Sequence, residues 1–132
     1  MPQVVVDIAR SPDTCWRALT DAAQFAAWMP GLRSAVVLAE DAGLPREVHF
    51  EFSSKLSYTL AYTYDVVHRE VHWEPRSDAR SAVRGTARLE PHGDGTRLTY
   101  KLEQGAGRTV GDLVIGGAPS IVGALVRWVE SR

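Results

Sequence analysis

The stretch DLVIGGAPSIVGALVRWVE, residues 112–130, is the longest apolar segment of the chain and decides the fold. On a helix of 3.6 residues per turn its apolar side chains gather on one face. We therefore predict a long amphipathic C-terminal helix, with Asp112 capping its first turn. The residues of the predicted buried face are Ala118, Ile121, Val122, Leu125, Trp128 and Val129.

The same stretch contains residues that weaken its first turns. Gly116, Gly117 and Pro119 lower helix propensity, so we expect a late start or a kink rather than a functional gap. The uncharged part, residues 113–126, is shorter than the roughly twenty residues that span a membrane. A helix packed on a protein core is therefore the better interpretation.

Length and composition limit the class of protein. The chain has 132 residues, 45% of them hydrophobic, which predicts one domain over residues 1–132 with a substantial core. A net charge of -1 does not favour binding to nucleic acid or to an anionic membrane. The lone Cys15 excludes an internal disulfide, and the N-terminal residues lack a signal-peptide pattern. We expect a cytoplasmic protein, and a homodimer is compatible with the sequence.

The N-terminal third predicts a strand followed by two short helices. Residues 3–9, QVVVDIA, are rich in β-branched side chains. Ser11 is a good N-cap and Pro12 suits the first position of a helix that runs to about residue 20. Asp21 is a second candidate N-cap, for a helix that ends at Trp28 before the breaker Met29-Pro30-Gly31.

Residues 33–103 alternate between apolar and polar side chains, which is typical of strands. We predict strands over residues 33–40, 46–54, 57–67, 68–74, 80–90 and 96–103, with a tight turn over residues 91–95. An antiparallel sheet with one dry face shows this period of two. The dry face needs a cover, and the C-terminal helix is the largest one available, which gives an α+β class.

This order of elements, together with two motifs, resembles the START / Bet v 1-like superfamily, whose members include polyketide cyclase/dehydratase-like proteins and lipid-transfer domains. The motifs are SPDTCWRALTDAAQFAAWMPG at residues 11–31 and RGTARLEPHGDGTRLTYKLE at residues 84–103. The resemblance implies a helix-grip fold, in which a curved antiparallel sheet wraps around a long C-terminal helix and leaves a hydrophobic cavity. Fold alone does not fix function.

The expected cavity suggests a set of ligand-binding residues, most of them aromatic. Rings with hydroxyl groups suit a flat, partly polar ligand such as a polyketide, a quinone or a lipid. Each of these side chains is individually more typical of a core than of a ligand contact. The candidates are Trp28, Phe50, Phe52, Tyr58, Leu60, Tyr62, Tyr64, Trp73, Val83, Tyr100, Ile121 and Leu125.

Three functions therefore remain open: a ligand carrier, a polyketide cyclase/dehydratase-like enzyme, and a protein-interaction module. For the enzyme, a hydroxyl of Tyr58, Tyr62 or Tyr64 could donate to a developing enolate, but no catalytic base can be assigned. The histidines fit no metal site, so we expect surface positions for them, no metal and no cofactor. They are His49, His68, His72 and His92.

Overall fold

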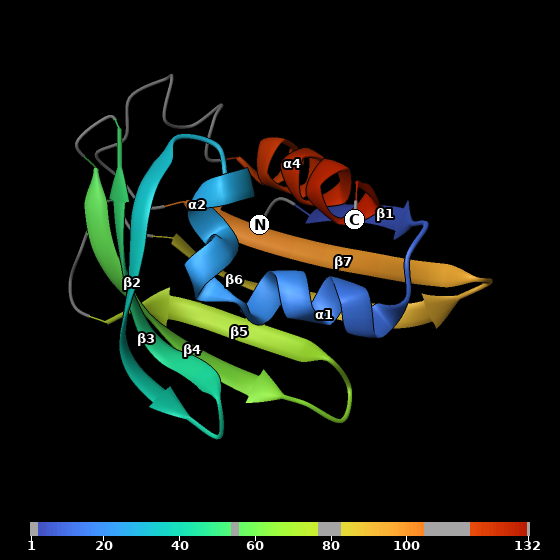
Figure 1. The fold of residues 1–132 in the computed structure, drawn as a ribbon, viewed down its shortest axis with the longest axis horizontal. Coiled ribbons are helices and arrows are strands. Elements are labelled where there is room, and N and C mark those ends of the chain that lie inside the picture. Colours follow the sequence, from blue (N-terminus) through green and yellow to red (C-terminus); the bar gives the residue numbers. More distant parts are fainter. Residues whose placement is uncertain (1–2, 54–55, 77–82, 105–116, 132) are drawn as a thin grey trace.

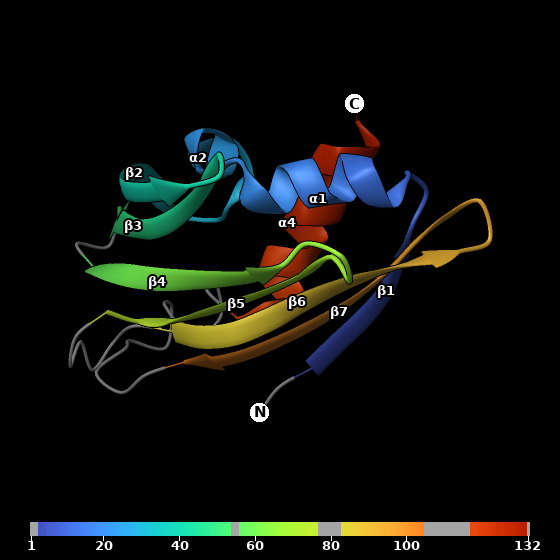
Figure 2. The same cartoon turned by 90° about the horizontal axis from the view of Figure 1, so that it is seen from below.

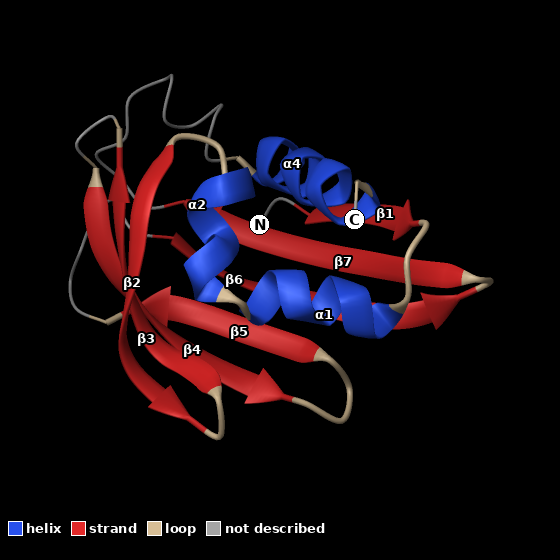
Figure 3. Cartoon of the chain, in the orientation of Figure 1, coloured by secondary structure: helices blue, strands red, loops and turns tan. Residues whose placement is uncertain are grey.

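The computed structural model of the protein describes residues 3–53, 56–76, 83–104 and 117–131. The described strands form one seven-stranded sheet that curves around the helices (Figures 1 and 3). The strands are β1 (Gln3–Ile8), β2 (Leu32–Asp41), β3 (Leu44–Phe52), β4 (Ser57–Asp65), β5 (Glu70–Pro75), β6 (Val83–His92) and β7 (Gly95–Gln104). The helices are α1 (Pro12–Thr20), the 3-10 turn η1 (Ala22–Gln24), α2 (Phe25–Trp28) and α4 (Ala118–Glu130).

The sheet has the order β1-β7-β6-β5-β4-β3-β2, and every neighbouring pair is antiparallel. From β2 to β7 each strand pairs with the next along the chain. Strand β1 pairs with β7 and forms one edge of the sheet, and β2 forms the other edge. The helices lie on the concave face, and β2 and β3 curl up beside α2 (Figure 2). This arrangement confirms the predicted α+β helix-grip architecture.

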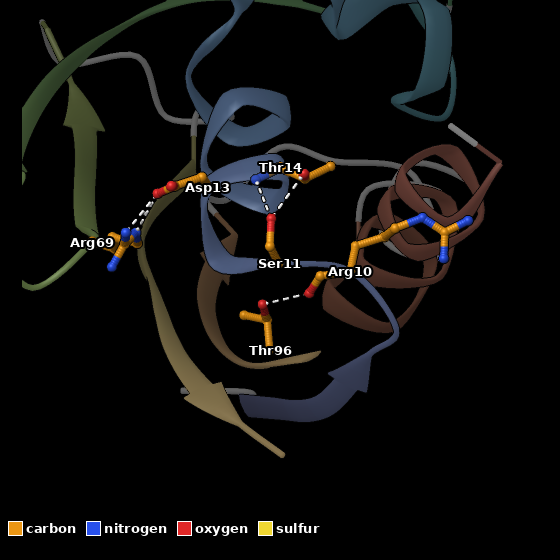
Figure 4. A network of polar contacts seen from close by, with 6 residues as sticks. All are labelled: Arg10, Ser11, Asp13, Thr14, Arg69 and Thr96. Atoms are coloured by element: carbon orange, nitrogen blue, oxygen red, sulfur yellow. Dashed lines mark hydrogen bonds and ion pairs between the residues drawn. The ribbon is translucent and has the colours of Figure 1, made fainter. Parts of the chain in front are cut away.

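The start of α1 follows the sequence prediction. Ser11 has an extended backbone and its Oγ accepts a hydrogen bond from the Thr14 backbone N–H at 3.3 Å, while Pro12 occupies the first turn. Asp13, in the same turn, accepts hydrogen bonds from the Arg69 guanidinium, with an Nε to Oδ1 distance of 3.2 Å (Figure 4). The helix is therefore attached to the turn between β4 and β5.

The prediction of one continuous helix after Asp21 is wrong. The chain forms the 3-10 turn η1 and then the single turn α2, and the Asp21 side chain makes no capping hydrogen bond. The Asp21 backbone N–H instead donates to the Arg17 carbonyl at 3.0 Å and closes α1. Gly31 then turns the chain into β2 with a φ of 73°, a conformation that glycine adopts without strain.

Helix α4 begins late, as the glycines and Pro119 predict. Gly117 is its N-cap and Pro119 lies in its first turn. The expected cap Asp112 lies outside the described residues. The prediction that Trp128 belongs to the buried face is wrong, because Trp128 is only half-buried. The buried residues of α4 are Ala118, Ile121, Val122, Ala124, Leu125 and Val129. None of the described helices is both long enough and apolar enough to cross a membrane.

The strand predicted over residues 57–67 is too long at its end. β4 stops at Asp65, and Val66 and Val67 lie in an exposed turn, with 57% and 84% of their surfaces accessible. His68 belongs to this turn and not to a strand shared with His72, because its backbone N–H donates to Asp65 Oδ1 at 3.2 Å. Arg69 completes the reversal with a φ of 49°.

Candidate functional site

A pocket of about 90 Å³ lies between the concave face of the sheet and the helices. Strands β3 to β7 provide most of its wall, α1 and α2 cover one side, and Ile121 of α4 closes another. Its lining residues are Leu19, Phe25, Trp28, Met29, Pro30, Gly31, Phe50, Phe52, Ser53, Leu56, Tyr58, Leu60, Tyr62, Val71, Trp73, Val83, Tyr100, Leu102 and Ile121.

The structure brings all but two of the predicted ligand-binding residues into this wall. The Tyr64 hydroxyl instead donates to the Pro45 carbonyl at 2.6 Å, and its ring lies edge-on to Trp16 of α1. Leu125 is fully buried on α4 but does not reach the pocket. The remaining predicted residues share one cavity, and their role in ligand binding stays a prediction.

The aromatic side chains of the wall form two groups, and within each group the rings contact one another. On one side Phe25 of α2 stacks on Phe50, with ring centroids 6.1 Å apart and planes 9° apart, and Tyr58 lies 5.8 Å from Phe50. On the other side Trp73 contacts Tyr100 at 5.3 Å and Tyr62 at 6.2 Å. The sheet alternation explains this clustering, because these strand residues all point to the concave face.

The described wall carries no formal charge. No Asp, Glu, Lys, Arg or His appears among the described lining residues. Burial is the main cause that raises the pKa of Tyr62 well above its usual value of 10.0, and burial also raises the pKa of Tyr100. Both phenols therefore stay protonated at neutral pH and can donate a hydrogen bond, but they cannot serve as a general base.

Trp28 contributes a polar group whose hydrogen-bonding capacity is unused. Its side chain is only 8% exposed, and its indole Nε1 is buried with no hydrogen-bond partner among the described residues. The neighbouring Phe25 ring packs edge-on at 5.9 Å and offers no acceptor in its plane. Most buried donors are satisfied in native structures, so this N–H calls for an explanation.

The mouth of the pocket lies where α2 leads into β2 and β3 leads towards β4. Gly31 and Ser53 are exposed there, and the Ser53 backbone N–H donates to the Gly31 carbonyl at 2.9 Å. Half-buried Met29 and Leu56 line the same end. A methionine side chain adopts many conformations, so the shape of the pocket can change more easily at this end than beside the aromatic rings of the strands.

Several lining residues were missed from the sequence. Val71 and Leu102 share strand faces with Trp73 and Tyr100, so the alternation was a signal that could have included them. Leu19 and Phe25 lie on helices whose position over the sheet the sequence does not specify. The mouth residues belong to connections, where no periodic pattern exists.

The histidines lie away from the pocket. His49 contacts the Thr59 hydroxyl at 3.0 Å, and His68 and His72 pair with Asp65 and Glu70 at 2.7 and 2.8 Å. Across the described ranges of the chain, no cluster of three or more His, Cys, Asp or Glu side chains could hold a metal ion.

Comparison with known proteins shows what this chain resembles. The family model described as polyketide cyclase / dehydrase and lipid transport matches residues 3–129. A START superfamily protein from Mycobacterium smegmatis superposes with a TM-score of 0.75 and 19% identity, over 99% of this chain and 94% of that one. No match was found among curated proteins.

Two further solved structures share the fold. The Zhui aromatase/cyclase from Streptomyces sp. R1128 has a TM-score of 0.72 and 17% identity, over 99% of this chain and 93% of that one. A STAR-related lipid transfer protein from Xanthomonas axonopodis has a TM-score of 0.71 and 18% identity, over 96% of this chain and 84% of that one. At these identities the likeness establishes the fold and leaves function to the site.

Proposed function

Because the chain belongs to the polyketide cyclase / dehydrase and lipid transport family, we propose that it binds a small apolar or aromatic molecule in the pocket between its sheet and its helices. The observation that carries the proposal is a described wall without charged side chains, whose aromatic rings come from four strands and from α2, and which α2 and α4 close. Such walls are typical of small-molecule sites, in which apolar surface provides affinity and a few polar groups provide orientation.

The size of the pocket limits how the ligand enters. Ligand sites usually enclose about 300–1,000 Å³, whereas this pocket has about 90 Å³. A molecule of more than a few heavy atoms therefore has to widen it. The mouth is the suitable place, because Met29 and Leu56 are half-buried there and Gly31 and Ser53 are exposed.

Native mass spectrometry of the purified protein, followed by NMR titration with toluene, tests the proposal. We expect toluene to shift the signals of lining residues such as Tyr62 and Trp73. Val83→Phe fills the pocket from β6 and should abolish the shifts, whereas Val5→Phe, at a half-exposed position on β1, should leave them unchanged. The proposal is wrong if toluene shifts only surface residues, or if both variants respond as the wild type does.

A polyketide cyclase-like activity is the second candidate, and the protonated phenols favour it. Tyr62 and Tyr100 can donate a hydrogen bond to the carbonyl oxygen that becomes negative during an aldol step, and water takes the α-proton of the substrate, because the described wall holds no basic side chain. Tyr62→Phe and Tyr100→Phe should then lower turnover of a poly-β-ketone substrate while ligand binding persists. Tyr64→Phe is the matched control, because the Tyr64 hydroxyl lies outside the pocket. Equal turnover in all three variants would exclude this chemistry.

A further inference from the structure

We infer that the pocket selects an uncharged ligand that carries a hydrogen-bond-acceptor oxygen, and that Trp28 is the residue that selects it. This inference rests on the proposed function, because it names the chemical class of the molecule that the same pocket binds. It assigns to the Trp28 indole N–H a role in specificity that the apolar side chains of the wall cannot fulfil.

Trp28 carries a buried hydrogen-bond donor that has no partner among the described residues. Trp28 lies at the end of α2 and lines the pocket, yet its Nε1 has no partner among the described residues and is shielded from water. An indole nitrogen can only donate, so the missing partner has to be an acceptor. A buried donor without a partner destabilises the unliganded protein, and a ligand oxygen at this position would remove that penalty.

The rest of the wall excludes charged ligands. A buried carboxylate needs a cation or several donors, and a buried ammonium needs an anion. The described lining offers neither a basic nor an acidic side chain; besides Trp28 and Trp73, its polar side chains are those of Tyr58, Tyr62, Tyr100 and the exposed Ser53. Side-chain donors on rings therefore dominate the polar part of the wall. A ketone or a quinone matches them, whereas a fatty-acid carboxylate does not.

Shielding of the N–H group also links recognition to opening of the pocket. Because Nε1 has almost no accessible surface, an acceptor reaches it only when the surrounding side chains move apart. Trp28 is followed directly by Met29, Pro30 and Gly31 of the mouth. A ligand that widens the mouth therefore acts on the segment that carries the donor.

Three matched probes test this inference: acetophenone, which has a carbonyl oxygen; ethylbenzene, which has a similar shape and no acceptor; and benzoate, which is charged. We expect wild-type protein to bind acetophenone about ten-fold more tightly than ethylbenzene, the gain expected from one satisfied buried donor. Benzoate should bind more weakly than either. Trp28→Phe should remove the preference for acetophenone and leave ethylbenzene unaffected, while Trp16→Phe, outside the pocket wall, should keep the preference.

A second measurement needs no variant. In wild-type protein the Trp28 indole proton should move downfield in NMR spectra on addition of acetophenone and not of ethylbenzene. Equal binding of the two neutral probes, or an unchanged preference in Trp28→Phe, would overturn the inference and leave the proposed function standing. If neither neutral probe enters the pocket, the inference and the proposed function both fail.

Discussion

Gly85→Ala should destabilise the protein, because the added Cβ atom would clash with neighbouring atoms of β7 and β5. Gly85 lies on β6, opposite Trp73 of β5 and Leu102 of β7. A Cβ atom at this position would lie 2.2 Å from the backbone oxygen of Lys101 and 2.9 Å from Cζ2 of Trp73. The Lys101 oxygen belongs to a paired strand, so it cannot move away without disturbing the sheet.

The magnitude follows from two opposing terms. Overpacking in a rigid interior costs typically 1–3 kcal/mol, and this contact involves backbone, so we expect about 3 kcal/mol. Replacing glycine by alanine also lowers the conformational entropy of the unfolded chain, which stabilises the folded protein by about 0.4–1 kcal/mol. The net loss is about 2 kcal/mol, or a fall in Tm of roughly 7 °C for a chain of this length.

Urea unfolding and thermal melting measure this loss, and Gly123→Ala provides the control. Gly123 lies inside α4, where a Cβ would have only the flexible end of the Arg127 side chain nearby, at 3.4 Å. Alanine should therefore stabilise the helix by about 0.5–1 kcal/mol. The two substitutions should change stability in opposite directions. A Gly85→Ala protein as stable as the wild type would refute the close approach of β6 and β7 on which the reasoning rests.

Three further predictions concern α1 and the tyrosines. Ser11→Ala should lower stability by about 1 kcal/mol in urea unfolding, because the Thr14 N–H loses its acceptor; an unchanged midpoint would contradict the cap. Asp13→Asn should cost less than about 1 kcal/mol, since its ion pair with Arg69 is exposed, and the loss should shrink in high salt. Burial raises the folded pKa values of Tyr62, Tyr64 and Tyr100 above 10.0, so their contribution to stability should be complete below pH 10.0 and fall above it by roughly 1 kcal/mol per pH unit for each phenol, as measured by unfolding midpoints; a flat profile would contradict their burial.

Much of the fold was predictable because the strands are half-buried. Alternation placed Tyr58, Leu60 and Tyr62 on one face, and the structure finds all three buried. The same rule failed at Val66, because two valines continue the apolar pattern into a turn that Asp65 and Arg69 form. Local hydrogen bonds determine where β4 ends, and the spacing of apolar residues does not reveal such bonds.

The strand residues of the candidate site could be predicted from the sequence, but the contributions of the helices and connections could not. Strand periodicity brought Phe50, Trp73 and Tyr100 together without further information. The sequence did not reveal that Tyr64 would turn its hydroxyl to the Pro45 carbonyl, or that the Trp28 N–H would lack a partner. Both depend on tertiary contacts between segments distant along the chain.

The pairing of β1 with β7 has a consequence for biosynthesis. Gln3 lies opposite Lys101, so β1 precedes the other described strands in the chain and its partner β7 follows all of them. A ribosome adds about 5–20 residues per second, which leaves β1 waiting for several seconds with its backbone groups unpaired. Until then the nascent chain cannot complete its sheet, however stable the finished protein is.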